Sequence, residues 1–118
     1  MFAAGVYRIY HVTAAKIKPG KGDEAAKWWQ EKGKALFDSA PGTKSVKAYA
    51  VQFDFGGEYG LEIWREIEDY ASFDRLDEDI LANPKKYAAY FEAQELLEWG
   101  PNRLMGDWPE SHWSPPEE

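Results

Sequence analysis

Histidine is the first residue type in this sequence to suggest chemistry, because its side chain changes charge near neutral pH. The chain has two, His11 and His112. His112 stands among prolines near the C-terminal end, whereas His11 lies in a run of β-branched and aromatic residues. A histidine on a central strand can act as a general base. It can also be a structural residue whose ring is hydrogen-bonded inside the fold, and the sequence leaves both interpretations open.

Residues from three predicted strands could complete a site around His11. In a β-α-β-β-α-β sheet the third strand neighbours the first, so Glu62, Trp64 or Glu66 is expected beside His11. A carboxylate within about 4–6 Å would favour the protonated imidazole. Aromatic walls with a few polar groups are common in small-molecule sites, and an ordinary core has the same composition. The residues predicted to bind a substrate are Tyr7, Tyr49, Phe53, Glu62 and Trp64.

Several other chemistries lack the residues they need. Without cysteine there is no thiolate nucleophile, no disulfide and no cysteine-ligated metal. Two distant histidines without a nearby carboxylate cluster do not resemble a zinc or iron centre. Glycine-rich phosphate-binding motifs are missing as well, so nothing indicates a nucleotide. We therefore expect no metal and no cofactor.

The charge of the chain points away from nucleic acid. The formal net charge is −7, from 21 acidic and 14 basic residues, and no basic stripe is interleaved with aromatics. Binding to phosphate backbones requires clustered lysine and arginine. No apolar run approaches the roughly 20 residues of a membrane-spanning helix, and the first residues do not resemble a signal peptide. We expect a cytoplasmic protein that binds neither nucleic acid nor membrane.

The first half of the chain predicts two strands around a helix, followed by a third strand. Residues 5–18 and 44–55 are rich in β-branched and aromatic residues, and residues 59–67 alternate apolar and polar side chains. The helix between the first two strands is expected to start at Asp23 as N-cap. Trp28 and Trp29 belong to its apolar stripe, with Trp29 expected to be the deeper of the two.

The second half predicts a broken helical segment and a short strand. Residues 68–84 have helical periodicity with Asp69 as the expected N-cap, and residues 85–99 continue as a second helix after Asn83-Pro84. One short strand is expected around residues 102–106. We predict a single domain over residues 1–118, with its core at about residues 5–106 and a proline-rich acidic tail at 107–118.

This order predicts an α+β fold, the ferredoxin-like β-α-β-β-α-β arrangement with an antiparallel sheet. Both helical segments cover one face, so the other face, which includes aromatic residues on either assignment, needs a cover. A second copy supplies one, and we predict a homodimer that forms an α/β barrel. In the tail, Trp108 and Trp113 either belong to a loose end or anchor an arm on the neighbouring subunit, and their composition favours the arm.

Two stretches resemble the dimeric α/β-barrel superfamily. "VYRIYHVTAAKIKPGKGDEAAKWW" is similar to its opening strand, turn and helix, and "YGLEIWREIEDYASFDRL" to its third strand and second helix. Members include antibiotic-biosynthesis-type monooxygenases, the NIPSNAP group and stress-responsive A/B-barrel proteins. The family's haem enzymes use a helical histidine, and no predicted helix here contains one.

The resemblance implies either of two functions. The first is an enzyme that resembles cofactor-independent monooxygenases or related isomerases and lyases and acts on an apolar or aromatic small molecule in a pocket of the barrel, with His11 as the base. The second is a non-catalytic ligand-binding or assembly module. A solvent-connected cavity touching His11 would favour the enzyme, and a filled, dry interior would favour the module.

Overall fold

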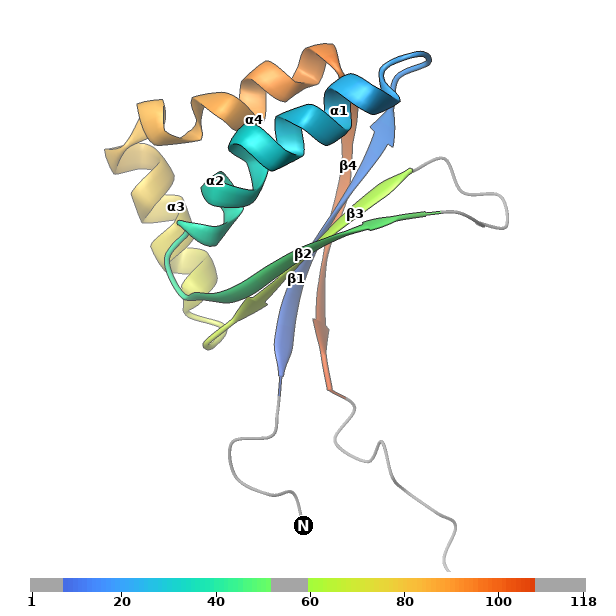
Figure 1. Ribbon diagram of the computed structural model, residues 1–118. Helices are drawn as coiled ribbons and strands as arrows, with labels where there is room; N and C mark the ends of the chain where they lie inside the picture. Colours follow the sequence, from blue (N-terminus) through green and yellow to red (C-terminus); the bar gives the residue numbers. More distant parts are fainter. Residues whose placement is uncertain (1–7, 52–59, 108–118) are drawn as a thin grey trace, which may run out of the picture.

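The computed structural model describes residues 8–51 and 60–107 and contains a four-stranded antiparallel sheet (Figure 1). The strands are arranged in the order β2-β3-β1-β4, so β1 is central and pairs on both sides. Long runs of β-branched and aromatic residues favour this extended conformation. The strands are β1 Ile9–Ile17, β2 Thr43–Ala50, β3 Leu61–Ile67 and β4 Leu97–Gly106.

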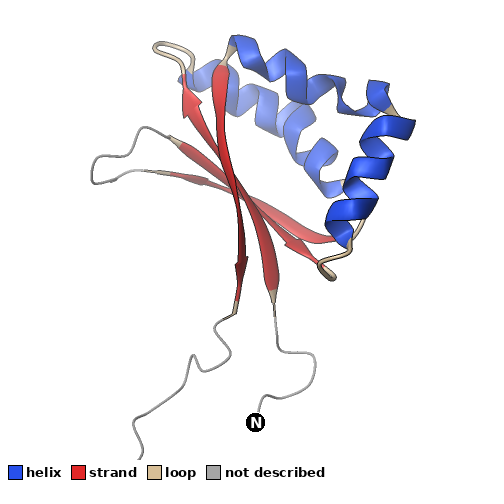
Figure 2. Cartoon of the chain, turned by 180° about the vertical axis from the view of Figure 1, so that it is seen from behind, coloured by secondary structure: helices blue, strands red, loops and turns tan. Residues whose placement is uncertain are grey.

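The helices of the described chain lie together on one face of this sheet (Figures 1 and 2). Two helical segments, one after β1 and one after β3, form the layer. The first comprises α1 Gly22–Trp28, a π-helical turn Trp29–Gly33 and α2 Lys34–Asp38. The second comprises α3 Ser72–Ala82, a 3-10 turn Pro84–Tyr87, α4 Ala88–Glu92 and a 3-10 turn Ala93–Glu95.

The predicted fold class is therefore confirmed: the chain is an α+β protein with the ferredoxin-like arrangement. The last strand is longer than expected, because β4 starts at Leu97, inside the stretch predicted to be helical. Leu97 is fully buried and pairs with Ile17 of β1. Short apolar runs suit a helix and a buried strand equally well, and here the pairing to β1 decides.

The pairing of β1 with β4 contains an irregularity that accommodates a proline. Thr13 is opposite Asn102 and Ala15 is opposite Trp99, so β4 has one more residue than β1 in this interval. Pro101 falls within it, where its missing N–H breaks no regular ladder bond. This bulge lets β4 follow β1 over its whole length.

The π-helical turn explains why Trp28 is the more deeply buried tryptophan, whereas the sequence predicts Trp29. Trp29 is four residues after Ala25 and seven before Leu36, so a regular helix would place these three on one face. The wider turn absorbs about one extra residue, and Trp28 becomes the residue aligned with Leu36. Trp28 is only 6% exposed and donates its indole N–H to the Ala89 carbonyl at 3.1 Å, while Trp29 is half-buried.

Both predicted N-caps are wrong in detail. The first helix starts at Gly22 with Lys21 as N-cap, and Asp23 lies in its first turn. The N-cap of α3 is Ala71. Asp69 lies just before it and accepts hydrogen bonds from the Ser72 hydroxyl and from Arg75, so its carboxylate still stabilises the start of the helix.

The alternation of side chains gives the two faces of the sheet different surroundings. On β1, His11 and Thr13 point toward the helices, whereas Tyr10 and Val12 point away. On β3, Arg65 points toward the helices and Trp64 away. Within residues 8–51 and 60–107, no helix has the length and apolar character needed to cross a membrane.

Candidate functional site

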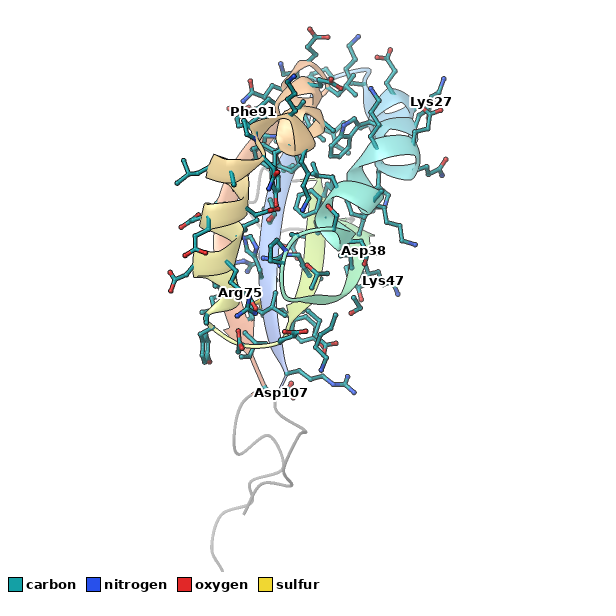
Figure 3. The ribbon with its side chains drawn as sticks, turned by 90° about the vertical axis from the view of Figure 1, so that its left-hand side faces the viewer. Lys27, Asp38, Lys47, Arg75, Phe91 and Asp107 are labelled. Atoms are coloured by element: carbon teal, nitrogen blue, oxygen red, sulfur yellow. The ribbon has the colours of Figure 1, made fainter. Side chains whose placement is uncertain are left out.

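A cavity of about 400 Å³ lies between the sheet and the helices. Its volume is in the usual range for sites that bind small molecules. Figure 3 shows α3 on one side of β1 and the first helical segment on the other, with side chains from both between them. The cavity is lined by His11, Thr13, Leu36, Phe37, Ala40, Arg65, Phe73, Leu76, Asp77, Ile80, Tyr87, Tyr90, Phe91 and Asn102.

His11 is held at both ring nitrogens. Nδ1 lies 3.1 Å from Nη2 of Arg65, and Nε2 lies 2.9 Å from Oδ1 of Asn102. Guanidinium has no acceptor, so Nδ1 must accept the hydrogen bond and carry the lone pair. Nε2 then carries the proton and donates it to Asn102. Arg65 therefore fixes both the tautomer of His11 and the orientation of the Asn102 amide.

The pKa of His11 is lowered from its ordinary value of 6.5. Burial is the main cause, because it disfavours the charged imidazolium. The positive charge of Arg65 lowers the pKa further, and the hydrogen bond to Asn102 acts in the opposite direction. His11 is thus neutral at physiological pH, which is the form a general base requires.

Arg65 is the most deeply placed charged residue of the cavity. Its side chain is 1% exposed and hydrogen-bonds to three neutral acceptors: the Pro41 carbonyl at 3.5 Å, the Thr43 hydroxyl at 2.9 Å and His11. Burial lowers its pKa, and Tyr87 offsets part of this effect. Among the described residues, no carboxylate forms an ion pair with it.

Asn102 and Thr13 complete the polar floor. The Thr13 hydroxyl donates to Oδ1 of Asn102 at 2.8 Å, so this oxygen accepts from both Thr13 and His11. The two residues face each other across β1 and β4, at the edge of the bulge. Because Asn102 is exposed on an edge strand, this end of the floor is open to water.

Aromatic rings form most of the walls. Phe73 of α3 lies against the His11 ring, with centroids 5.0 Å apart. Tyr90 stacks on Trp99 at 4.3 Å, and burial raises the pKa of the Tyr90 phenol. Phe37 belongs to the same aromatic cluster, at 6.2 Å from Trp99. Phe91 is 56% exposed, so part of the wall faces solvent.

A hydrogen-bonded group ties α3 to the turn that precedes α4. Tyr87 is buried and donates its hydroxyl to the Asp79 carboxylate, which also forms an ion pair with Lys86 at 2.6 Å. Burial raises the pKa of Tyr87, and the Asp79 hydrogen bond raises it further. The pKa of Asp79 is lowered by its bonds to Lys86 and Tyr87. This group fixes one wall of the cavity.

The predicted neighbours of His11 do not lie beside it. Glu62 and Trp64 point to the other face of the sheet, where Trp64 donates its indole N–H to Glu62 at 3.1 Å. Tyr49 is on that face as well, with its ring centroid 5.8 Å from that of Trp64. The expectation of one pocket shared with His11 is therefore wrong for these three. Tyr7 and Phe53 lie outside the described residues.

Arg65, Asn102 and Phe73 were missed as cavity residues. One signal was present for Arg65. It lies between Ile63 and Ile67 on the same face of the strand and is thus the one charged residue of an apolar face. Asn102 carried none, because the bulge that brings it opposite Thr13 depends on pairing. Among the described residues no group of three or more histidine, aspartate or glutamate side chains could hold a metal ion.

Comparisons with known proteins identify the fold. No family model matches the sequence, and no curated protein matches it. Similar solved structures include HapK from Hahella chejuensis, with a TM-score of 0.64 and 14% identity over 92% of this chain and 99% of HapK. A NIPSNAP family protein from Agrobacterium tumefaciens has a TM-score of 0.63 and 15% identity, covering 84% of this chain and 90% of its own.

A third similar structure is SnoaB from Streptomyces nogalater, a cofactor-independent oxygenase. It has a TM-score of 0.57 and 14% identity, over 83% of this chain and 90% of SnoaB. The resemblance to ferredoxin-like proteins of the monooxygenase, NIPSNAP and A/B-barrel types is thus confirmed for the fold. At these identities the activity of a neighbour does not transfer with the fold.

Proposed function

We propose that this protein is a small-molecule enzyme whose apolar or aromatic substrate binds in the cavity between the sheet and the helices. The supporting observation is the cavity of about 400 Å³ with His11 in its floor. A filled interior would have favoured a purely structural histidine instead. The proposed reaction is of the cofactor-independent monooxygenase type, or an isomerisation or elimination.

His11 is the proposed base. All three reactions can begin with the removal of a proton from the substrate, which leaves a substrate anion. The lone pair of His11 is on Nδ1, where Arg65 donates a hydrogen bond. Catalysis therefore requires the guanidinium to release Nδ1 when the substrate enters.

A non-catalytic ligand-binding module is the second candidate. It is favoured by the same contacts, because both nitrogens of His11 are engaged, by Arg65 and by Asn102. If the guanidinium never releases Nδ1, the ring only orients its neighbours and the cavity only binds.

The homodimer is proposed through the face of the sheet that the helices leave uncovered. Tyr10, Tyr49 and Trp64 form an aromatic group there. The ring centroid of Trp64 lies 5.4 Å from that of Tyr10 and 5.8 Å from that of Tyr49. The same face carries the acidic Glu62 and the basic Arg103, which form an ion pair with 2.7 Å between Oε2 and Nη2. A surface with both charges and aromatic rings can pair with its own copy across a twofold axis.

The enzyme proposal is tested with a panel of hydroxylated and carboxylated benzenes and naphthalenes. Binding is first detected by thermal shift, and turnover is then followed by dioxygen consumption and by proton NMR. We expect His11→Ala to retain binding and to lose about 10²–10⁴-fold in turnover, the usual contribution of a general base. Lys16→Ala is the control, because Lys16 is exposed on the same strand.

Two outcomes would contradict the proposal. Turnover that is unchanged in His11→Ala removes His11 as the base. Binding without turnover in the wild-type protein, for every compound that binds, favours the ligand-binding module.

A further inference from the structure

The buried cation in the floor of the cavity indicates the charge of the ligand. Arg65 is 1% exposed, and its hydrogen bonds go to a carbonyl, a hydroxyl and an imidazole. Buried charges are normally paired with an opposite charge, because removal from water is costly without one. Among the described residues Arg65 has no such partner.

Arg65 also retains unused donors. A guanidinium has five N–H groups in a planar fork that matches a carboxylate in bidentate fashion. Three of its N–H groups are used by Pro41, Thr43 and His11. Nη2 lies beside His11, and both residues line the cavity, so a ligand anion in the floor could accept a hydrogen bond from the second N–H of Nη2.

The other charged residue of the lining does not neutralise Arg65. Asp77 of α3 is exposed, and no ion pair joins it to Arg65. Its carboxylate faces water, where it is solvated. The floor is therefore positive and the solvent side of the wall negative, which orients an anionic group inward.

We infer that the cavity takes an aromatic ligand that carries an anionic oxygen group, a carboxylate or an ionised enol or phenol, and that Arg65 is its counter-cation. The inference rests on the proposed ligand site and narrows its substrate class. The rings of Phe37, Phe73 and Tyr90 provide the apolar contact for the aromatic part. The anionic group is placed in the floor next to His11.

This arrangement also couples binding to the state of His11. An anion that accepts from the free N–H of Nη2 attracts the guanidinium away from His11 and lengthens the 3.1 Å contact between Nη2 and Nδ1. Once that hydrogen bond is broken, Nδ1 becomes available as a base. Substrate charge would thus switch His11 from an acceptor of the Arg65 hydrogen bond to a proton acceptor.

The test compares 2-naphthoate with 2-naphthamide, which have nearly the same shape and differ in charge. Dissociation constants are measured by calorimetry at pH 7.5 on the full chain. We expect 2-naphthoate to bind at least tenfold more tightly than 2-naphthamide. Arg65→Gln should bring the ratio close to one, and Arg65→Lys should retain most of it because the positive charge remains.

Arg75→Gln is the matched control, since it removes an arginine from α3 outside the cavity lining and should keep the ratio. Circular dichroism establishes which variants fold. If Arg65→Gln does not fold, the ratio of the two dissociation constants in the wild-type protein decides the question. Equal binding of the two compounds, binding of neither, or a preference that survives in a folded Arg65→Gln overturns the inference. A carboxylate preference without any turnover leaves it standing and overturns only the proposed enzyme.

Discussion

The network around His11 is decided by one arginine. Because Arg65 can only donate, the ring must accept at Nδ1 and donate at Nε2, and the amide of Asn102 must present its oxygen. The Thr13 hydroxyl donates to the same oxygen. Four side chains from three strands thus have a single consistent hydrogen-bond arrangement. Without Arg65, the tautomer of His11 and the orientation of the Asn102 amide would no longer be fixed.

Protonation of His11 should weaken the fold at acidic pH. Its pKa lies below 6.5 in the folded state, since burial and Arg65 disfavour the imidazolium. The unfolded chain therefore binds more protons between the folded pKa and 6.5, and stability falls as the pH is lowered through that window. Above about pH 6.5 the contribution is fully present.

This dependence is measured by denaturant unfolding of the wild type and His11→Gln at pH 7.5, 6.5 and 5.5. We expect the free energy of unfolding of the wild type to fall more steeply with decreasing pH than that of the variant. His112 is common to both proteins and cancels in the difference. Parallel curves for the two proteins would show that His11 titrates normally.

At the level of elements, the close contact inside the first helical segment depends on a glycine. A Cβ at Gly33 would lie 2.7 Å from the Trp28 ring and 2.9 Å from the Trp29 ring. Trp28 cannot easily move, because it is buried and its N–H is bonded to the Ala89 carbonyl. The π-helical turn and this glycine together let two adjacent tryptophans pack against one helix.

Gly33→Ala should therefore destabilise the protein by about 1–3 kcal/mol, the usual cost of overpacking a core. In an open helical position the same change would stabilise by up to about 1 kcal/mol. Gly22→Ala is the matched control, because no heavy atom lies within 4 Å of the added Cβ. Equal thermal unfolding midpoints for the two variants would contradict the role assigned to Gly33.

Three strands and the end of the fourth were predictable from the sequence, the start of β4 at Leu97 was not, and the site was predictable only in part. Alternation separated Ile63, Arg65 and Ile67 from Glu62 and Trp64, but both sets were compatible with a place next to His11. Only the register, in which His11 is opposite Arg65, selects between them. A shift of one residue in register exchanges the faces of a strand, and no local residue preference specifies it.

The same limit applies to the helical layer. Phe73 lies in a stretch that the sequence predicts to be helical, and it is part of α3, but its contact with His11 depends on how α3 crosses the sheet. The π-helical turn and the bulge at Pro101 are single-residue departures from regular periodicity. Their effects on Trp28 and Asn102 follow from packing and pairing rather than from the local sequence.

At the scale of the whole molecule, the proposed dimer is the main prediction. Light scattering at micromolar concentration should give twice the 13.5 kDa of the chain. Tyr49→Glu places a charge among the rings of the uncovered face, and we expect it to raise the dimer dissociation constant at least tenfold. Leu81→Glu, at an 83% exposed position on the helical side, should have no effect. A monomeric wild type would contradict the proposal.

The central position of β1 has a consequence for how this protein can change. Its odd-numbered residues face the helices, where His11 and Thr13 line the cavity, and its even-numbered residues, such as Tyr10, face the opposite surface. An insertion or deletion of one residue in β1 would therefore move the side chains on one side of it to the opposite face of the sheet and exchange the two roles at once. Substitutions in β1 can change the cavity and the opposite surface almost independently, whereas a shift of one residue along this strand abolishes both together.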